Sequence, residues 1–295
     1  SELNMKKVPV ILLGLILVLA SCTGSSEKEK GDSKADSVVR DSMSSSTDDS
    51  KQQETKVTYS FAMPSPLQIG DIFQNAGLTY MENLLNPTDQ ITKYNTKTKK
   101  LLNLGVYSSD MSYAVLNEQT QQAKKYMKVV KQLGEDLGMS EIFNAKSMMD
   151  RFDNSLNERD SVIQILAELQ EDMDYYLEDT EQEHLNTLVF TGAWIEGMYF
   201  GVNAIENDDR VDLTTRLIEQ MTLMRNVSRG LENYPNPNEE VLSLKSELED
   251  LQNKFDQLLE MKRKQMKQGE KLSFSFTDLK NVGMKIEDIR NQIVN

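Results

Sequence analysis

Residues 185–205 read LNTLVFTGAWIEGMYFGVNAI, and this stretch decides the fold because it is the most apolar segment after the first 21 residues. Its length would suit a membrane span, but Glu196 lies at its centre and an ionised carboxylate is costly in lipid. Gly197 and Gly201 lie one helical turn apart, so a neighbouring helix could approach closely on that face. We therefore expect a buried core helix.

The carboxylate of Glu196 needs a cation or a proton, because burying an unpaired ion is expensive. Residues 160–209 contain no Lys or Arg, so a cationic partner must come from a distant part of the chain. A structural ion pair is the favoured interpretation. In the alternative interpretation, Trp194, Glu196 and Tyr199 line a ligand pocket.

Apolar residues at helical spacing continue on both sides of this segment. Ser65 and Pro66 are typical of a helix start, Gly77 and Gly138 of helix ends, and Ser140 of the next cap. The fold class that we predict is all-α, a single multi-helix, bundle-like domain of about seven or eight helices. The helices after the first are expected at residues 97–137, 141–153, 158–178, 181–206, 211–233, 238–266 and 277–293, with a short extended piece at 271–276.

The helix at residues 238–266 has an apolar seam with 3,4 spacing. The favoured interpretation is a helix packed within its own domain. A coiled-coil homodimer through residues 241–258 is the alternative. The seam consists of Val241, Leu244, Leu248, Leu251, Phe255 and Leu258.

The N-terminal residues are typical of an export signal. Lys6 and Lys7 precede an apolar run that is too short to span a bilayer. Residues 19–22 read LASC, which resembles the lipobox of bacterial lipoproteins. The resemblance implies that residues 1–21 are removed, with residues 1–4 upstream of the signal itself, and that Cys22 carries the lipid.

The next segment, residues 22–56, is rich in Ser, Asp, Glu and Lys and contains no aromatic residue. It cannot bury enough apolar surface to offset the entropy of ordering, so we expect a disordered tether. The helical domain would then occupy residues 57–295.

The charge and the residue counts exclude several function classes. With 33 basic and 47 acidic residues the net charge is −14, which disfavours nucleic acid and direct adsorption to anionic lipid. His184 is the only histidine and Cys22 the only cysteine, which rules out a di-iron centre or a two-histidine zinc site within one chain. No phosphate-binding loop or nucleophile elbow occurs. We therefore assign no catalytic residue, no metal and no cofactor.

Two acidic clusters remain, the run at residues 168–183 and the group Asp208, Asp209 and Asp212. We expect solvated surfaces in both places, and we expect His184 to be a surface residue among acids. A docking surface for a basic partner or for divalent ions is the alternative for the run. Calcium binding is the alternative for the aspartate group, although its spacing is not that of an EF-hand.

Four motifs together resemble a family of uncharacterised helical lipoproteins of the Bacteroidota. They are SPL at residues 65–67, AGL at 76–78, LGVY at 104–107 with Asp110 and Tyr113, and GAWIEGMY at 192–199. The resemblance covers residues 60–293. It implies a helical fold, lipidation and an envelope location, and it supplies no catalytic residues.

The expected function is a non-enzymatic, lipid-anchored helical domain that binds another protein of the cell envelope. Acyl chains on Cys22 would hold it to a membrane. We expect that to be the outer membrane, with the domain on its periplasmic face or at the cell surface. The alternative is a small-molecule-binding or enzymatic domain with a pocket near Glu196. A deep cavity beside Glu196 would favour the alternative, whereas a filled core with a broad surface groove would favour binding.

The anchor is testable by one substitution. Cys22→Ser should abolish acylation and release the domain into the soluble fraction, because a serine cannot carry the thioether-linked lipid. Fractionation followed by a carbonate wash measures this. A substituted chain that stays in the washed membranes would show that the anchor lies elsewhere.

Overall fold

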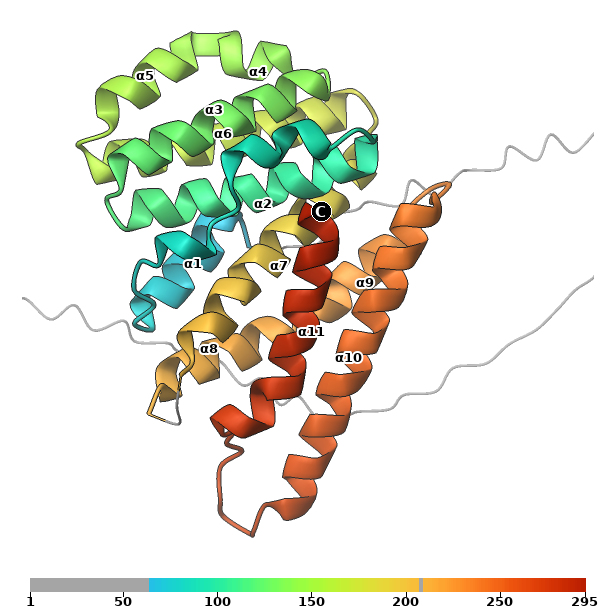
Figure 1. Ribbon diagram of the computed structural model, residues 1–295. Helices are drawn as coiled ribbons and strands as arrows, with labels where there is room; N and C mark the ends of the chain where they lie inside the picture. The colour runs from blue at the N-terminus through green and yellow to red at the C-terminus, as the bar shows by residue number, and fades with distance from the viewer. Residues whose placement is uncertain (1–63, 207–208) are drawn as a thin grey trace, which may run out of the picture. The chain divides into compact units, whose positions relative to one another are not determined.

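The structure, a computed structural model, describes residues 64–206 and 209–295. The predicted signal, lipobox and tether lie outside the described residues. Within the described ranges every regular element is helical and no strand occurs, which confirms the all-α prediction (Figure 1). The helices are α1 (Pro66–Asn75), α2 (Lys97–Leu116), α3 (Thr120–Asp136), α4 (Ser140–Asn144), α5 (Met148–Ser155), α6 (Arg159–Asp179), α7 (Asn186–Ala204), α8 (Val211–Met221), α9 (Met224–Glu232), α10 (Glu239–Gln265) and α11 (Phe276–Val294).

The described residues form eleven α-helices, so the prediction of seven or eight was wrong. The difference arises because three predicted helices are each broken in two, at residues 117–119, 145–147 and 222–223. Glu118 and Ser147 have left-handed φ angles of 57° and 50° at two of these breaks. Neither residue type signals such a turn as glycine would, which is why periodicity missed them.

The first predicted helix boundary is confirmed in detail. Ser65 caps α1, since its Oγ accepts from the Gln68 N–H at 3.2 Å while its own N–H donates to Gln68 Oε1 at 2.7 Å. Gly77 follows the helix with φ +93°, a conformation that favours glycine. The predicted cap at Ser140 is wrong, because Ser140 is the first residue of α4 and makes no capping bond.

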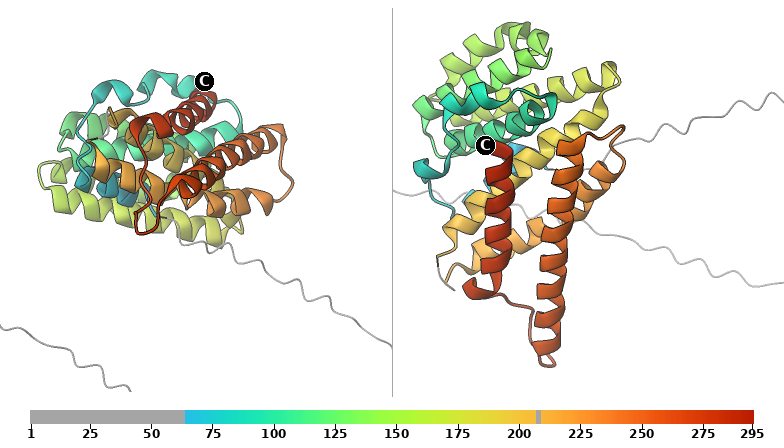
Figure 2. Two further views of the ribbon diagram at one scale, coloured as in Figure 1. Left: turned by 90° about the horizontal axis from the view of Figure 1, so that it is seen from below. Right: turned by 45° about the vertical axis from the view of Figure 1, so that its right-hand side comes forward.

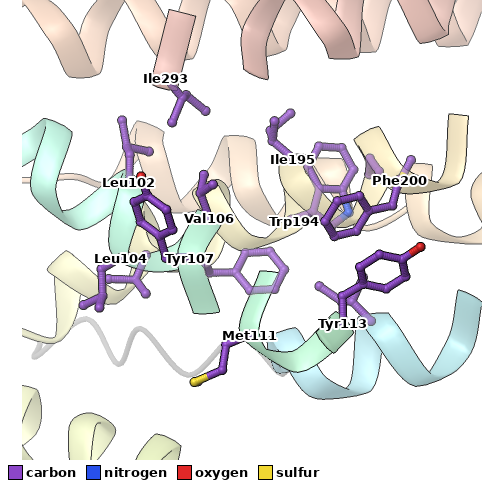
Figure 3. Close-up of a cluster of buried hydrophobic side chains, with 14 of the residues drawn as sticks. Leu102, Leu104, Val106, Tyr107, Met111, Tyr113, Trp194, Ile195, Phe200 and Ile293 are labelled. Carbon is purple, nitrogen blue, oxygen red and sulfur yellow. The ribbon is translucent and has the colours of Figure 1, made fainter. Parts of the chain in front are cut away.

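Helix α7 is the predicted core helix, and it packs against α1, α2, α8, α9 and α11 (Figures 1 and 2). Trp194 and Ile195 of α7 are fully buried, and Figure 3 shows them among side chains of α2 such as Val106 and Tyr113. No helix in the described ranges is long and apolar enough to cross a membrane. The interpretation of residues 185–205 as a buried core helix is therefore confirmed.

Backbone meets backbone where α2 crosses α7. A Cβ atom added at Gly192 would lie 1.9 Å from the carbonyl oxygen of Leu102, and one at Gly105 would lie 1.9 Å from that of Val189. The predicted close approach at Gly197 and Gly201 is also present, with α1 as the neighbour. The tightest contact, however, lies about one turn earlier than the pair that the sequence suggested.

The seam of α10 faces α9 and α11, and all six of its apolar residues are buried within the chain. This confirms the interpretation as a helix packed in its own domain. A homodimer at residues 241–258 would therefore have to use the outer face of α10, where Leu242 is exposed.

The close crossing of α2 and α7 predicts that a single methyl group added at Gly192 strongly lowers the stability of the domain. Gly192→Ala would force two backbones apart, and overpacking of this kind costs about 1–3 kcal/mol. At about 2–4 °C per kcal/mol for a domain of this size, the melting temperature should fall by roughly 6–12 °C at the upper end of that range. Gly283→Ala in α11 is the control, because its Cβ would meet Val202 at an ordinary 3.5 Å. Equal melting temperatures for the two variants would contradict the close crossing.

Candidate functional site

Three ionisable side chains meet in the interior, one from each of three helices. Asp110 comes from α2, Glu196 from α7 and Arg290 from α11, and their exposed fractions are 0%, 0% and 8%. Arg290 donates two hydrogen bonds to Glu196, from Nε to Oε2 at 2.9 Å and from Nη2 to Oε1 at 3.0 Å. The predicted structural ion pair, with a cation from a distant part of the chain, is confirmed.

The loop between α1 and α2 closes over this cluster. Arg290 Nη2 also donates to the carbonyl oxygen of Leu84 at 3.4 Å, and the Asn86 N–H donates to Asp110 Oδ2 at 3.2 Å. Tyrosine hydroxyls fix the loop by donating to its carbonyl groups. Tyr113 donates to Thr79, Tyr107 to Pro87 and Tyr126 to Asn86.

The cluster contains two acids and one cation, so one acid must hold a proton to keep the interior neutral. Burial raises the pKa of the Asp110 carboxyl well above its usual value, the neighbouring Glu196 charge raises it further, and Arg290 opposes both effects. Burial also raises the pKa of Glu196, but there the guanidinium and the hydrogen bond with Asp110 lower it. The proton therefore lies on Asp110, beside the ionised Glu196.

The three residues of the predicted pocket lie in different surroundings. Glu196 is enclosed by its ion pair, and the Tyr199 ring lies 4.7 Å from the guanidinium carbon of Arg290. Trp194 is fully buried in the core, and its indole N–H has no hydrogen-bond acceptor. Neither of the two described hollows is lined by any of the three.

The larger hollow is a groove of about 990 Å³ between α6 on one side and α1, α2 and α7 on the other. We call it the α6 groove. Its floor is apolar, and its rim carries the exposed acids Glu171, Asp174 and Glu178. The floor side chains include Met111, Leu166, Leu169, Met173, Leu177, Val189 and Phe190.

In the acidic run at residues 168–183, the acids from Glu168 to Asp179 belong to α6, an amphipathic helix that turns Leu169, Met173 and Leu177 inward, and Glu181 and Glu183 follow its end. Partial desolvation by the neighbouring groove walls raises the pKa of the Asp174 carboxyl, while hydrogen bonds from Asn186 and Gln170 oppose that shift. The predicted solvated face is present, and the same acids edge the α6 groove. The sequence showed the charges but not the hollow, which depends on how far α6 stands from α7.

The remaining polar candidates do not form a site in the described ranges. His184 is half-buried with its ring edge-on to Tyr234 at 5.2 Å, and burial lowers its pKa, so it is neutral at physiological pH. No group of three or more metal-ligating side chains occurs among the described residues. Of the predicted aspartate group, Asp208 lies outside the described residues.

Comparisons with protein-family models, with curated proteins and with solved structures found no match to this chain. The functional argument therefore depends on geometry. Sequence reasoning did not name Arg290, although a signal was present, because Arg290 interrupts the buried apolar face formed by Ile286, Ile289 and Ile293. Asp110 was noted only as part of a motif.

The cluster predicts a non-additive pair of substitutions. Glu196→Gln removes the bidentate bond, but Asp110 can then ionise and neutralise Arg290. Glu196→Gln combined with Asp110→Asn leaves a buried cation without an acid, which costs about 3–5 kcal/mol. Denaturant unfolding should show a loss for the double variant that exceeds the sum of the single losses. Additive losses would contradict a shared charge cluster.

The raised pKa of Asp110 also predicts how the stability of a single variant, Asp110→Asn, differs from that of the wild type as the pH changes. The contribution of Asp110 to the free energy of unfolding is fully present below about pH 3.9, the pKa of an aspartate in the unfolded chain. It is lost as the pH rises from there through the higher pKa of Asp110 in the folded chain. Asn keeps the shape and does not titrate, so the variant should match wild type near pH 4 and gain up to about 1.4 kcal/mol per pH unit above it. Urea unfolding of both chains between pH 4 and 7 measures this difference. A constant difference over that range would contradict a protonated Asp110.

Proposed function

We propose that this chain is a lipid-anchored protein of the cell envelope whose helical domain binds another envelope protein and performs no catalysis. The α6 groove is the binding site. One observation carries the proposal: the larger of the two described hollows has an apolar floor and an acidic rim, and it lies outside a core in which Glu196 is enclosed by its ion pair with Arg290.

The chemistry of the groove specifies its occupant. An extended peptide segment with apolar side chains would cover the floor, and Lys or Arg residues would meet Glu171, Asp174 and Glu178. The part of α6 that lines the groove, from Leu166 to Glu178, is about 18 Å long, and about six residues of an extended peptide would span that length. Such a short basic and apolar segment is the partner that we propose.

The location of the protein is supported by its sequence. The lipobox at Cys22 supplies the anchor, and the 34 residues after it would average roughly 30–35 Å end to end as a flexible coil. That reach would let the domain meet proteins near the outer membrane, on the periplasmic side or at the surface.

The second interpretation, a small-molecule or enzymatic site at Trp194, Glu196 and Tyr199, would require an opening to the interior. Glu196 has no exposed surface, and its two oxygens already bind Arg290. A substrate would have to break that ion pair before it could reach the carboxylate. No observation at these residues favours this function over binding at the groove.

The test is site-specific photo-crosslinking of the full chain in its own envelope. A photoreactive residue at Ala167, which is exposed and lines the groove, should give one discrete adduct, and the same residue at Leu242 on α10 should not. Glu171→Lys with Glu178→Lys should remove that adduct, while Glu249→Lys on α10 should leave it unchanged. Identical adducts from both positions, or an adduct that survives charge reversal at the rim, would contradict the proposal.

A further inference from the structure

The hairpin formed by α10 and α11 ends in a tip, residues 261–276, that lies beyond the other helices (Figures 1 and 2). Leu258 is the last buried residue of α10, and Leu279 is the first of α11. No residue between these two is buried. Phe274 is the one tip residue that packs against the core, as a partly buried side chain. Core packing therefore does not explain the composition of the rest of the tip.

The tip is basic in a strongly acidic chain. Residues 261–276 contain five basic residues and one acid, Glu270, which gives a net charge of +4 against −14 for the whole chain. Two acids flank the tip, and each is paired with a tip lysine: Glu260 with Lys264 and Asp278 with Lys262. Arg263, Lys267 and Lys271 are exposed and add to the positive surface.

The tip is also the main place where large apolar side chains reach solvent. Met261, Met266, Leu272 and Phe276 are 42%, 42%, 38% and 41% exposed. They are four of the eight exposed large apolar residues in the described ranges. Exposed apolar side chains next to lysines and arginines are typical of segments that settle into the interface of an anionic bilayer.

The geometry points to a lipid surface, and we propose that the tip of the α10–α11 hairpin binds anionic lipid headgroups. Residues 261–275 line neither described hollow, and Phe276 alone of the tip residues lies at the edge of the smaller one, so the basic part of the tip is a convex surface outside both hollows. A projecting loop can meet a flat surface without any change in the rest of the domain.

The acidic net charge of the chain does not prevent this contact. The rise of α10 from Glu239 to Gln265 is about 40 Å, whereas charges are screened beyond roughly 8 Å at physiological ionic strength. The acids at the start of α10 therefore do not act on lipid at the tip. The expectation that net charge disfavours anionic lipid holds for the chain as a whole and not for this end of it.

This contact is independent of the proposed binding role of the α6 groove and of the anchor at Cys22. Its test uses the full chain with Cys22→Ser, so that one introduced cysteine carries an environment-sensitive fluorophore. Met266→Cys places the label in the tip, and Tyr175→Cys, at a residue 69% exposed on α6, is the control position. Each chain is titrated with phosphatidylglycerol-containing vesicles and with pure phosphatidylcholine vesicles.

The label at position 266 should shift to the blue with anionic vesicles only, and the label at 175 should not shift. Lys264→Gln, Lys267→Gln and Lys271→Gln together should weaken the response about 100-fold, at about fivefold for each lysine. Lys93→Gln, Lys125→Gln and Lys128→Gln change the net charge equally at exposed lysines elsewhere and should have little effect. No shift at 266, an equal shift with phosphatidylcholine, or equal effects of the two triple variants would overturn the proposal.

Discussion

The ion pair between Glu196 and Arg290 is the interaction on which the rest of the structure depends. Removing two such charges from water costs several kcal/mol for each ion, so the pair is stable only if its geometry is good and its remaining polar atoms are satisfied. The two hydrogen bonds from Arg290 to Glu196, the carbonyl of Leu84 and the Asn86 N–H on Asp110 meet most of that requirement, and Asp110 Oδ1 alone of the cluster's carboxyl oxygens has no hydrogen-bond partner among the described residues. Three helices and one loop must therefore be in register at a single point, which makes the cluster a strict constraint on the fold.

The glycine contact between α2 and α7 places the two acids side by side. Gly105 and Gly192 let the two backbones touch, and Asp110 and Glu196 each follow about one turn later on the same two helices. Larger residues at either glycine would separate the carboxyl groups. Packing and electrostatics are thus two aspects of one contact. This contact closes the interior around the cluster. The two binding sites that we propose, the α6 groove and the hairpin tip, both lie on the outer surface and carry opposite charges.

The sequence predicted the features that depend on a local pattern of residues, and it missed those that depend on how separate helices pack. The high apolar content of α7 and the apolar periodicity of α10 placed both helices in the core correctly. The absence of Lys and Arg from residues 160–209 correctly required a cation from a distant part of the chain. The left-handed turns at Glu118 and Ser147 were missed because their side chains carry no such signal. The α6 groove was missed because its lining comes from α1, α2, α6 and α7, and no single segment encodes how these four helices pack.

The central claim is that the interior is closed around one buried proton, and infrared difference spectroscopy of the carboxyl groups tests it most directly. The account predicts a protonated carboxyl band at neutral pH that disappears in Asp110→Asn. It also predicts that this band shifts only slowly after transfer into D₂O, because water does not reach the cluster. The absence of such a band at neutral pH, or its complete shift within the mixing time, would show a charged or solvent-open site and would contradict the account.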